Sequence, residues 1–98
     1  MPEPCKVIAL CGSTRFRETF QEVQQRLTLE GYLVLSPVFF DDFRPDAAAK
    51  AMLDHLHRQR MDMADEVLII NVDGYIGQST REEIAYARSS GKPVRYLV

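Results

Sequence analysis

Two acids stand side by side, Glu82 and Glu83, just after a glycine-rich turn in the stretch GYIGQSTREEIAYA. Ser79 and Glu82 fit the S-x-x-E pattern of a capping box, in which two side chains bind backbone amides at a helix start. The capping box accounts for Glu82, but it leaves Glu83 without a structural task. The helix dipole favours any acid in a first turn. The pattern therefore allows two interpretations of Glu83, a solvated helix residue or a carboxylate that takes part in chemistry.

The sequence CGSTR, which follows the first apolar run, is typical of a strand, a glycine and a helix start in succession. Gly12 would permit a tight turn, and the amides of Ser13 and Thr14 would point outward at the helix start, where anions bind. Arg15 or Arg17 could add a positive charge. The stretch matches neither the Walker pattern nor G-x-G-x-x-G. Simple capping by Ser13 or Thr14 explains the same residues, so both interpretations stay open.

Asp54 and His57 are three residues apart and therefore lie on the same side of a helix. They could be surface residues, or they could reach into a cleft. His55 and His57 point apart and no further ligand set accompanies them, so the sequence predicts no zinc site, other metal or cofactor. A carboxylate at an anion site, with an acid or histidine opposite, suits cleavage at an anomeric carbon. One group attacks or stabilises that carbon, and the other manages the proton on the leaving group.

The elements that must position these residues alternate along the chain. Short, apolar, β-branched runs predict strands at residues 6–12, 32–37, 66–72 and 93–98. Apolar spacing and cap residues predict helices at 14–30, at 46–64 with Asp46 as its cap, and from 79 until Gly91. The apolar faces of the first two helices should be Phe16, Phe20, Val23 and Leu27, and Ala49, Met52, Leu53, Leu56, the stem of Arg60 and Ala64.

Strands that alternate with helices in this way must be joined by right-handed crossovers. The expected fold class is therefore α/β, with a doubly wound, Rossmann-like or flavodoxin-like parallel sheet of about four strands and helices on both faces. Residues 1–98 should form a single domain. Such sheets bind ligands beyond the carboxyl ends of their strands. The loops expected to form a ligand site are thus CGSTR, SPVFFDDF and NVDGYIGQST.

Composition limits the classes of partner. The net charge of -2 is spread along the chain without a basic stripe, so we expect neither a nucleic-acid polymer nor a membrane as partner. Cys5 and Cys11 should share one strand face, too far apart to bond, as reduced, packed thiols. The first residues lack a signal-peptide pattern, and no segment is long enough to span a bilayer. We expect a cytoplasmic protein.

Three stretches resemble the nucleoside 2-deoxyribosyltransferase superfamily: CGSTRF after the first strand, MADEVLIIN in the third, and GYIGQSTREEIAYARSSGKPVRYL to the end. That superfamily includes 2'-deoxynucleoside 5'-phosphate N-hydrolases and small uncharacterised relatives. The resemblance covers nearly the whole chain in motif order. It implies the doubly wound sheet and a homo-oligomer, a dimer or a higher assembly.

The resemblance also implies roles for individual residues. The nucleophile is the glutamate of the family's E-φ-x-x-A motif (φ, an apolar residue), here Glu83, which would attack C1' of a ribosyl or deoxyribosyl group. Tyr75 is a candidate to orient it. The residues expected to hold the substrate are Cys11, Gly12, Ser13, Thr14, Arg15, Gly77, Ser79 and Thr80.

The chain departs from the family at one position. Family members usually carry an aspartate eight residues before the aspartate of the Ala-Asp pair, and here that residue is His57. Either Asp54, one turn earlier, or His57 would then serve as the proton donor. The expected function is cleavage of the N-glycosidic bond of a nucleoside or nucleoside 5'-monophosphate, with hydrolysis favoured over base transfer. The alternative is a nucleotide-binding or sensor module without turnover.

Overall fold

The computed structural model describes residues 4–98, so residues 1–3 of the predicted domain lie outside the described part. The strands are β1 (Val7–Gly12), β2 (Leu33–Leu35), β3 (Glu66–Ile70) and β4 (Val94–Tyr96). The helices are α1 (Arg17–Leu29), α2 (Ala47–Met63) and α3 (Gln78–Ser89), with short 3-10 turns η1 (Thr14–Phe16) and η2 (Val72–Gly74). Each predicted strand and helix is present, with boundaries that differ by a few residues.

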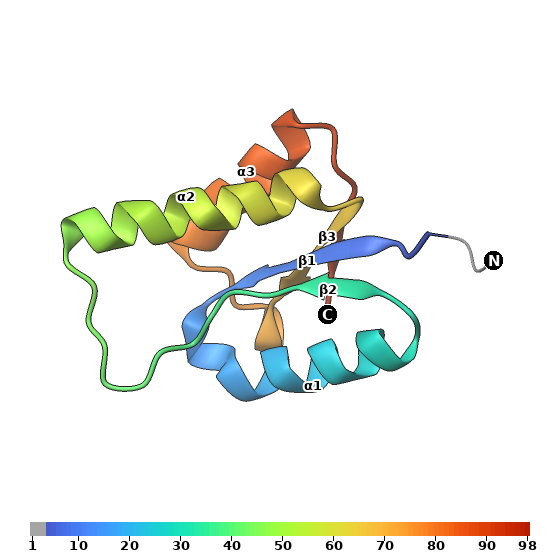
Figure 1. The fold of residues 1–98 in the computed structure, drawn as a ribbon, viewed down its shortest axis with the longest axis horizontal. Coiled ribbons are helices and arrows are strands. Elements are labelled where there is room, and N and C mark those ends of the chain that lie inside the picture. The colour runs from blue at the N-terminus through green and yellow to red at the C-terminus, as the bar shows by residue number, and fades with distance from the viewer. Residues whose placement is uncertain (1–3) are drawn as a thin grey trace.

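The four strands form one parallel sheet in the order β2-β1-β3-β4. Helix α1 covers one face of the sheet, and α2 and α3 lie together on the other (Figure 1). The predicted doubly wound α/β fold is therefore confirmed. The chain leaves β1 towards β2 on one side and later returns to β3 on the other. Because ligands bind where the strand order reverses, the carboxyl ends of β1 and β3 are the place to look for a site.

Alternation along the strands divides the core into two layers, because successive side chains of a strand point to opposite faces. One layer joins the sheet to α2 and α3 and contains Ala9, Cys11, Met61, Ala64, Val67, Ile69, Ile84 and Ala87. The other joins the sheet to α1 and contains Ile8, Leu10, Phe20, Val23, Leu27, Leu68 and Ile70. All five residues of β3 are buried, as expected for a central strand of a parallel sheet.

Local signals set the ends of the first two helices. Phe20, Val23 and Leu27 of α1 are buried as predicted, and Phe16 packs against the same layer from the 3-10 turn that precedes the helix. At the start of α2, the Asp46 carboxylate accepts a hydrogen bond from the Ala49 amide at 2.8 Å. This is the predicted N-cap.

The predicted apolar face of α2 is wrong in part. Met52 and Leu56 are exposed, whereas His57 and Met61 are buried against the sheet. The helix is therefore rotated about its axis relative to the face chosen from the sequence. Histidine is classed as a polar residue when apolar spacing is read from a sequence. The pattern therefore does not predict a buried helix face that contains His57.

The two cysteines do not share a strand face. Cys11 is fully buried in β1, but Cys5 precedes the strand and is exposed, and both are free thiols. The expectation of two packed cysteines is therefore wrong for Cys5, because the strand begins only at Val7. Within residues 4–98, the structure contains no helix with the length and apolar character needed to cross a membrane.

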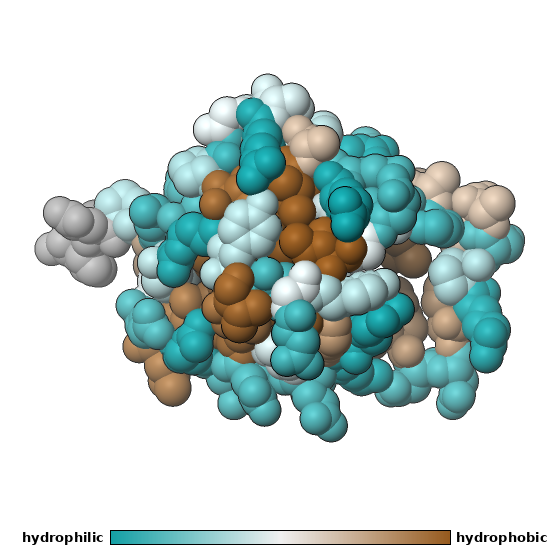
Figure 2. Space-filling model, turned by 180° about the vertical axis from the view of Figure 1, so that it is seen from behind, coloured by the Kyte–Doolittle hydropathy of each residue, from teal (hydrophilic) through white to brown (hydrophobic). Residues whose placement is uncertain are grey.

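The back of the molecule exposes apolar surface. Figure 2 shows apolar side chains gathered in the middle of this face, with hydrophilic side chains around them. The edge strand β4 and the residues after it leave Tyr96 and Val98 exposed. Apolar surface of this kind is common where subunits meet. The homo-oligomer expected from the sequence stays a prediction.

Candidate functional site

A cleft of about 780 Å³ opens at the carboxyl ends of β1 and β3. This volume lies within the range of pockets that enclose small molecules, roughly 300–1,000 Å³. Its polar lining comes from the turn after β1, from α2 and from the first turns of α3, and its apolar lining from the loop between β2 and α2 and from α2 itself. The apolar and aromatic members are Pro37, Val38, Phe39, Phe40, Phe43, Pro45, Leu53 and Leu56. The cleft therefore joins a polar region to an aromatic one.

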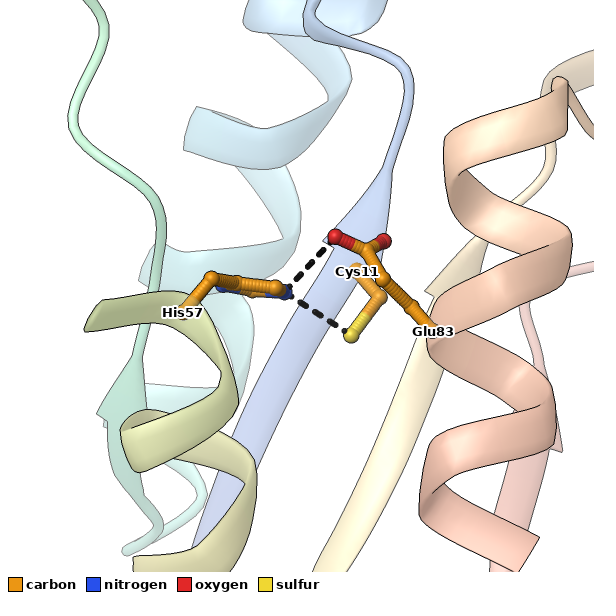
Figure 3. Close-up of side chains that lie close together, drawn as sticks. All are labelled: Cys11, His57 and Glu83. Atoms are coloured by element: carbon orange, nitrogen blue, oxygen red, sulfur yellow. Dashed lines mark hydrogen bonds and ion pairs between the residues drawn. The ribbon is translucent and has the colours of Figure 1, made fainter. Parts of the chain in front are cut away.

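Three side chains from different elements meet at the base of this cleft (Figure 3). Cys11 comes from β1, His57 from α2 and Glu83 from α3. The Nε2 atom of His57 lies 3.1 Å from the Cys11 Sγ atom and 3.4 Å from the Glu83 Oε2 atom. The carboxylate and the imidazole line the cleft, while the thiol is fully buried behind them.

The environment of Glu83 favours its protonated form. Burial raises the pKa of its carboxyl from 4.5 to about 7, and the Asp54 carboxylate adds to this rise while the Lys50 ammonium opposes it. A solvated helix acid would not show such a pKa. Glu83 is thus a partly buried carboxylate in a cleft, with a pKa suited to exchange between its two forms near neutral pH.

His57 is neutral at neutral pH. Burial lowers the pKa of its imidazole to about 4, and the nearby Arg60 adds to this effect. Its buried Nδ1 atom has no hydrogen-bond partner among the described residues. We therefore assign the imidazole proton to Nε2, where the Glu83 carboxylate and the Cys11 sulfur can accept it. Burial also raises the pKa of the Cys11 thiol, and Glu83 raises it further, so Cys11 stays protonated.

The predicted capping box at the start of α3 is wrong. The helix begins at Gln78, its N-cap is Gly77, and no side chain caps it. Glu82 lies instead 3.4 Å from the Gln78 side-chain amide, one turn earlier. Because the helix starts before Ser79, that hydroxyl is free of the capping role and lines the cleft. The uncapped first amides of α3 thus lie beside the cleft, where they can bind anionic or hydroxyl oxygens.

Most of the predicted substrate-binding residues line the cleft. These are Gly12, Ser13, Thr14, Gly77, Ser79 and Thr80. Cys11 and Arg15 do not line it. Cys11 is covered by His57 and Glu83, and the Arg15 guanidinium lies over the Tyr75 ring, 4.1 Å from the ring centre. Arg17, the other arginine considered in the sequence, lines the cleft and forms a 2.8 Å ion pair with Asp41.

The remaining candidates, Asp54 and Tyr75, also line the cleft. Asp54 is half exposed and lies 3.4 Å from the Lys50 ammonium. Within residues 4–98, no hydrogen bond joins Tyr75 to Glu83; the Tyr75 ring packs edge-on against Phe16 instead. His57 is therefore the predicted residue that contacts Glu83 directly. The predicted orienting role of Tyr75 has no such contact to support it.

The sequence analysis assigned no role to the aromatic part of the cleft. Phe39, Phe40 and Phe43 lie in the loop after β2, in the stretch SPVFFDDF. The position of this loop at a strand end was a usable signal, but the loop contains no charged motif that would specify chemistry. The number of aromatic residues in the loop was the further signal, because small-molecule pockets are lined mainly by apolar and aromatic side chains.

The chain matches no protein-family model, and no curated protein sequence matches it significantly. Among solved structures, it is similar to a 2-deoxyribosyltransferase from the psychrotolerant bacterium Bacillus psychrosaccharolyticus, described as a biocatalyst for the synthesis of antiviral and antitumoral nucleosides. The TM-score is 0.73, the sequence identity 20%, and the alignment covers 92% of this chain and 70% of that one. At this identity the match shows a common fold.

Proposed function

We propose that the protein cleaves the N-glycosidic bond of a nucleoside 5'-monophosphate by hydrolysis, with Glu83 as the nucleophile at C1'. The observation that carries this proposal is the position of Glu83, a partly buried carboxylate with a raised pKa at the base of a cleft of nucleotide size. The similarity of the fold to a 2-deoxyribosyltransferase supports the same class of chemistry. We place the chain in the nucleoside 2-deoxyribosyltransferase superfamily as part of this proposal.

The two regions of the cleft suit the two ends of a nucleotide. Aromatic rings in the loop after β2 offer faces on which a base can stack. The first turn of α3 offers amides that no side chain caps, and these suit a phosphate. The Arg17 guanidinium lies by the aromatic loop instead, 5.8 Å from the centre of the Phe39 ring and paired with Asp41. Between them, Glu83 would face the sugar. A site for anionic oxygens at the start of α3 favours a 5'-monophosphate as substrate, and the choice of hydrolysis over base transfer is tested with the panel below.

In the proposed reaction the ionised Glu83 attacks C1' while the bond to the base breaks, and the electron pair of that bond leaves with the base. Water then attacks C1' of the glycosyl–enzyme ester and releases the sugar phosphate and the carboxylate. The His57 imidazole orients the attacking carboxylate through its Nε2 atom. With a pKa of about 4, this histidine is a poor source of the proton for the base. Asp54 lines the same cleft, but its carboxylate lies 3.4 Å from the Lys50 ammonium and acts on Glu83 as a negative charge, so we assign the proton on the leaving base to solvent water.

The test is base release from a panel of ribo- and deoxyribonucleosides and their 5'-monophosphates, each with and without a second free base, followed by chromatography. Free base from a monophosphate without an acceptor base supports hydrolysis, and a new nucleoside formed with the acceptor indicates transfer. If no member releases base but a nucleotide raises the melting temperature, the alternative of a non-catalytic nucleotide-binding module replaces this proposal.

The pH dependence of base release should follow Glu83. Only its ionised form can attack, so kcat/KM should rise with pH and level off above an apparent pKa of about 7. A nucleophile with an ordinary carboxyl pKa would give a profile that is already flat from about pH 6 upward. The measurement is kcat/KM between about pH 5 and 9 in the presence of a chelator. A flat profile over this range would show that a group other than Glu83 limits the reaction.

A further inference from the structure

Cys11, His57 and Glu83 each present one possible metal ligand to the same point, although they come from three different elements. The sequence analysis excluded a zinc site because it compared only histidines on one helix. Folding instead brings together a sulfur, a nitrogen and an oxygen whose atoms all lie within 4.8 Å of one another. Both Cys11 and His57 are more than nine-tenths buried, so their positions are fixed by the core around them.

The distances are close to those of a tetrahedral metal centre. With zinc bonds of about 2.3 Å to sulfur and about 2.0–2.2 Å to nitrogen and oxygen, two ligand atoms of a tetrahedron stand about 3.4–3.6 Å apart. The His57 Nε2 atom lies 3.4 Å from the Glu83 Oε2 atom and 3.1 Å from the Cys11 Sγ atom. For an ion to fit, the sulfur must move away from the nitrogen by about half an ångström. The sulfur and the carboxylate oxygen lie within 4.8 Å of each other.

We propose that Cys11, His57 and Glu83 bind one divalent transition-metal ion, and that zinc is the physiological candidate. A thiolate, an imidazole and a carboxylate form a mixed donor set that suits zinc or cobalt and excludes magnesium and calcium, which prefer oxygen ligands alone. The three protein ligands leave the fourth position of the tetrahedron open. Because Glu83 and His57 line the cleft, an ion bound by them can be reached from the cleft.

Binding rearranges the protons of the site. The Cys11 thiol proton and the proton of a protonated Glu83 are released to solvent, and the resulting thiolate and carboxylate each donate an electron pair to the ion. The Nε2 atom of His57 must also donate its lone pair, so the imidazole proton moves to Nδ1, which has no acceptor among the described residues. Structural zinc sites normally provide such an acceptor. The missing acceptor weakens the site, so we expect reversible binding rather than a permanently held structural ion.

A bound ion would occupy the Glu83 carboxylate and close the base of the cleft. This consequence rests on the proposed function: an ionised Glu83 that holds zinc cannot attack C1'. Zinc is therefore expected to inhibit base release, and a chelator to restore it. Metal binding itself needs no substrate, so the two proposals can fail independently.

The experiment is a titration of the chelator-treated, desalted full chain with Co²⁺, read from the sulfur-to-cobalt charge-transfer absorption, followed by displacement with Zn²⁺. We expect one ion per chain. Cys11→Ser should remove the charge-transfer band, and Glu83→Gln should weaken cobalt binding by about tenfold or more. Cys5→Ser and His55→Ala are matched controls, because this exposed cysteine and this surface histidine lie outside the cluster. Both should bind like the wild type.

The outcomes separate the possibilities. A band that persists in Cys11→Ser but is lost in Cys5→Ser would place the thiolate ligand at the exposed cysteine and overturn the proposal. The absence of any band in folded wild-type protein would do the same. If Cys11→Ser does not fold, Glu83→Gln decides, because an unchanged cobalt affinity in that variant also overturns the site. A cobalt band in a protein that releases no base would support the metal site and contradict the proposed reaction.

Discussion

Glu83→Gln should lower the rate of base release by at least about 10³-fold, the scale seen when a nucleophile is removed. Glutamine keeps the shape of the side chain but cannot form an ester at C1'. The carboxylate lies at the base of the cleft, and His57 is the residue placed to hold it. The measurement is kcat/KM for the substrate found in the nucleotide panel, in chelator, so that no bound metal contributes.

The same substitution should stabilise the fold above neutral pH. The folded protein holds the Glu83 proton more tightly than the unfolded chain, since its pKa rises from 4.5 to about 7 on folding. Stability is therefore lost as the pH rises from about 4.5 to 7 and the buried carboxyl must ionise. Above that range the wild type is destabilised by up to about 3 kcal/mol relative to a neutral side chain. Urea unfolding at about pH 5 and pH 8 should show a gain for Glu83→Gln only at the higher pH.

Glu82→Gln is the matched control for both effects. The neighbouring acid is exposed, lies outside the cleft lining and interacts with Gln78 on its own helix. It should keep its activity within about twofold and its stability within about 0.5 kcal/mol. Equal activity in Glu83→Gln and the wild type would end the proposed mechanism, whatever the behaviour of the control.

Gly12→Ala should destabilise the protein by about 2–4 kcal/mol, which for a domain of this size lowers the melting temperature by roughly 10–20 °C. A Cβ atom at this position would lie 2.7 Å from the Ile70 carbonyl oxygen and 3.1 Å from the Ile70 Cβ atom. Gly12 and Ile70 are paired at the carboxyl ends of β1 and β3, the two central strands of the sheet. Neither strand can yield without disturbing the hydrogen bonds between β1 and β3, so the clash cannot be relieved cheaply. The measurement is thermal or urea unfolding of the full chain.

Gly31→Ala is the control that distinguishes the steric clash at Gly12 from the backbone strain of placing alanine at a positive φ. Gly31 has a φ of +97°, which is unfavourable for alanine, but nothing lies within 4 Å of a Cβ atom built there. Its substitution should cost only about 1–2 kcal/mol. If Gly12→Ala were no more damaging than Gly31→Ala, the close approach of Ile70 would not be the reason for the glycine after β1.

Local patterns predicted the layers of this protein well. The β-branched runs of β1 and β3 and the spacing of Phe20, Val23 and Leu27 were enough to place strands, helices and their order. These features depend on periodicity within a single element, so the sequence carries them directly. The same reasoning marked Glu83 as an acid without a clear structural task at the edge where such sheets bind ligands.

Details of the site could not be read in this way. The capping box was wrong because α3 starts at Gln78, and Arg15 does not line the cleft because its guanidinium packs over the Tyr75 ring. The first residue of a helix can shift by one or two positions at little cost in free energy, so a sequence motif does not fix it. Such small differences decide which polar side chains line the cleft and which of them face away.

The sequence by itself determined the parallel sheet and the edge at which the site lies. It also marked Glu83 as an acid at that edge without a clear structural task. Only the tertiary structure decided that Cys11, His57 and Glu83 converge. His57 follows Cys11 by 46 residues, and β3 then separates the helix of His57 from the helix of Glu83. Their meeting depends on the rotation of α2 about its axis. In that rotation His57 and Met61 are buried while Met52 and Leu56 are exposed, and it results from long-range packing against the sheet that no local periodicity encodes.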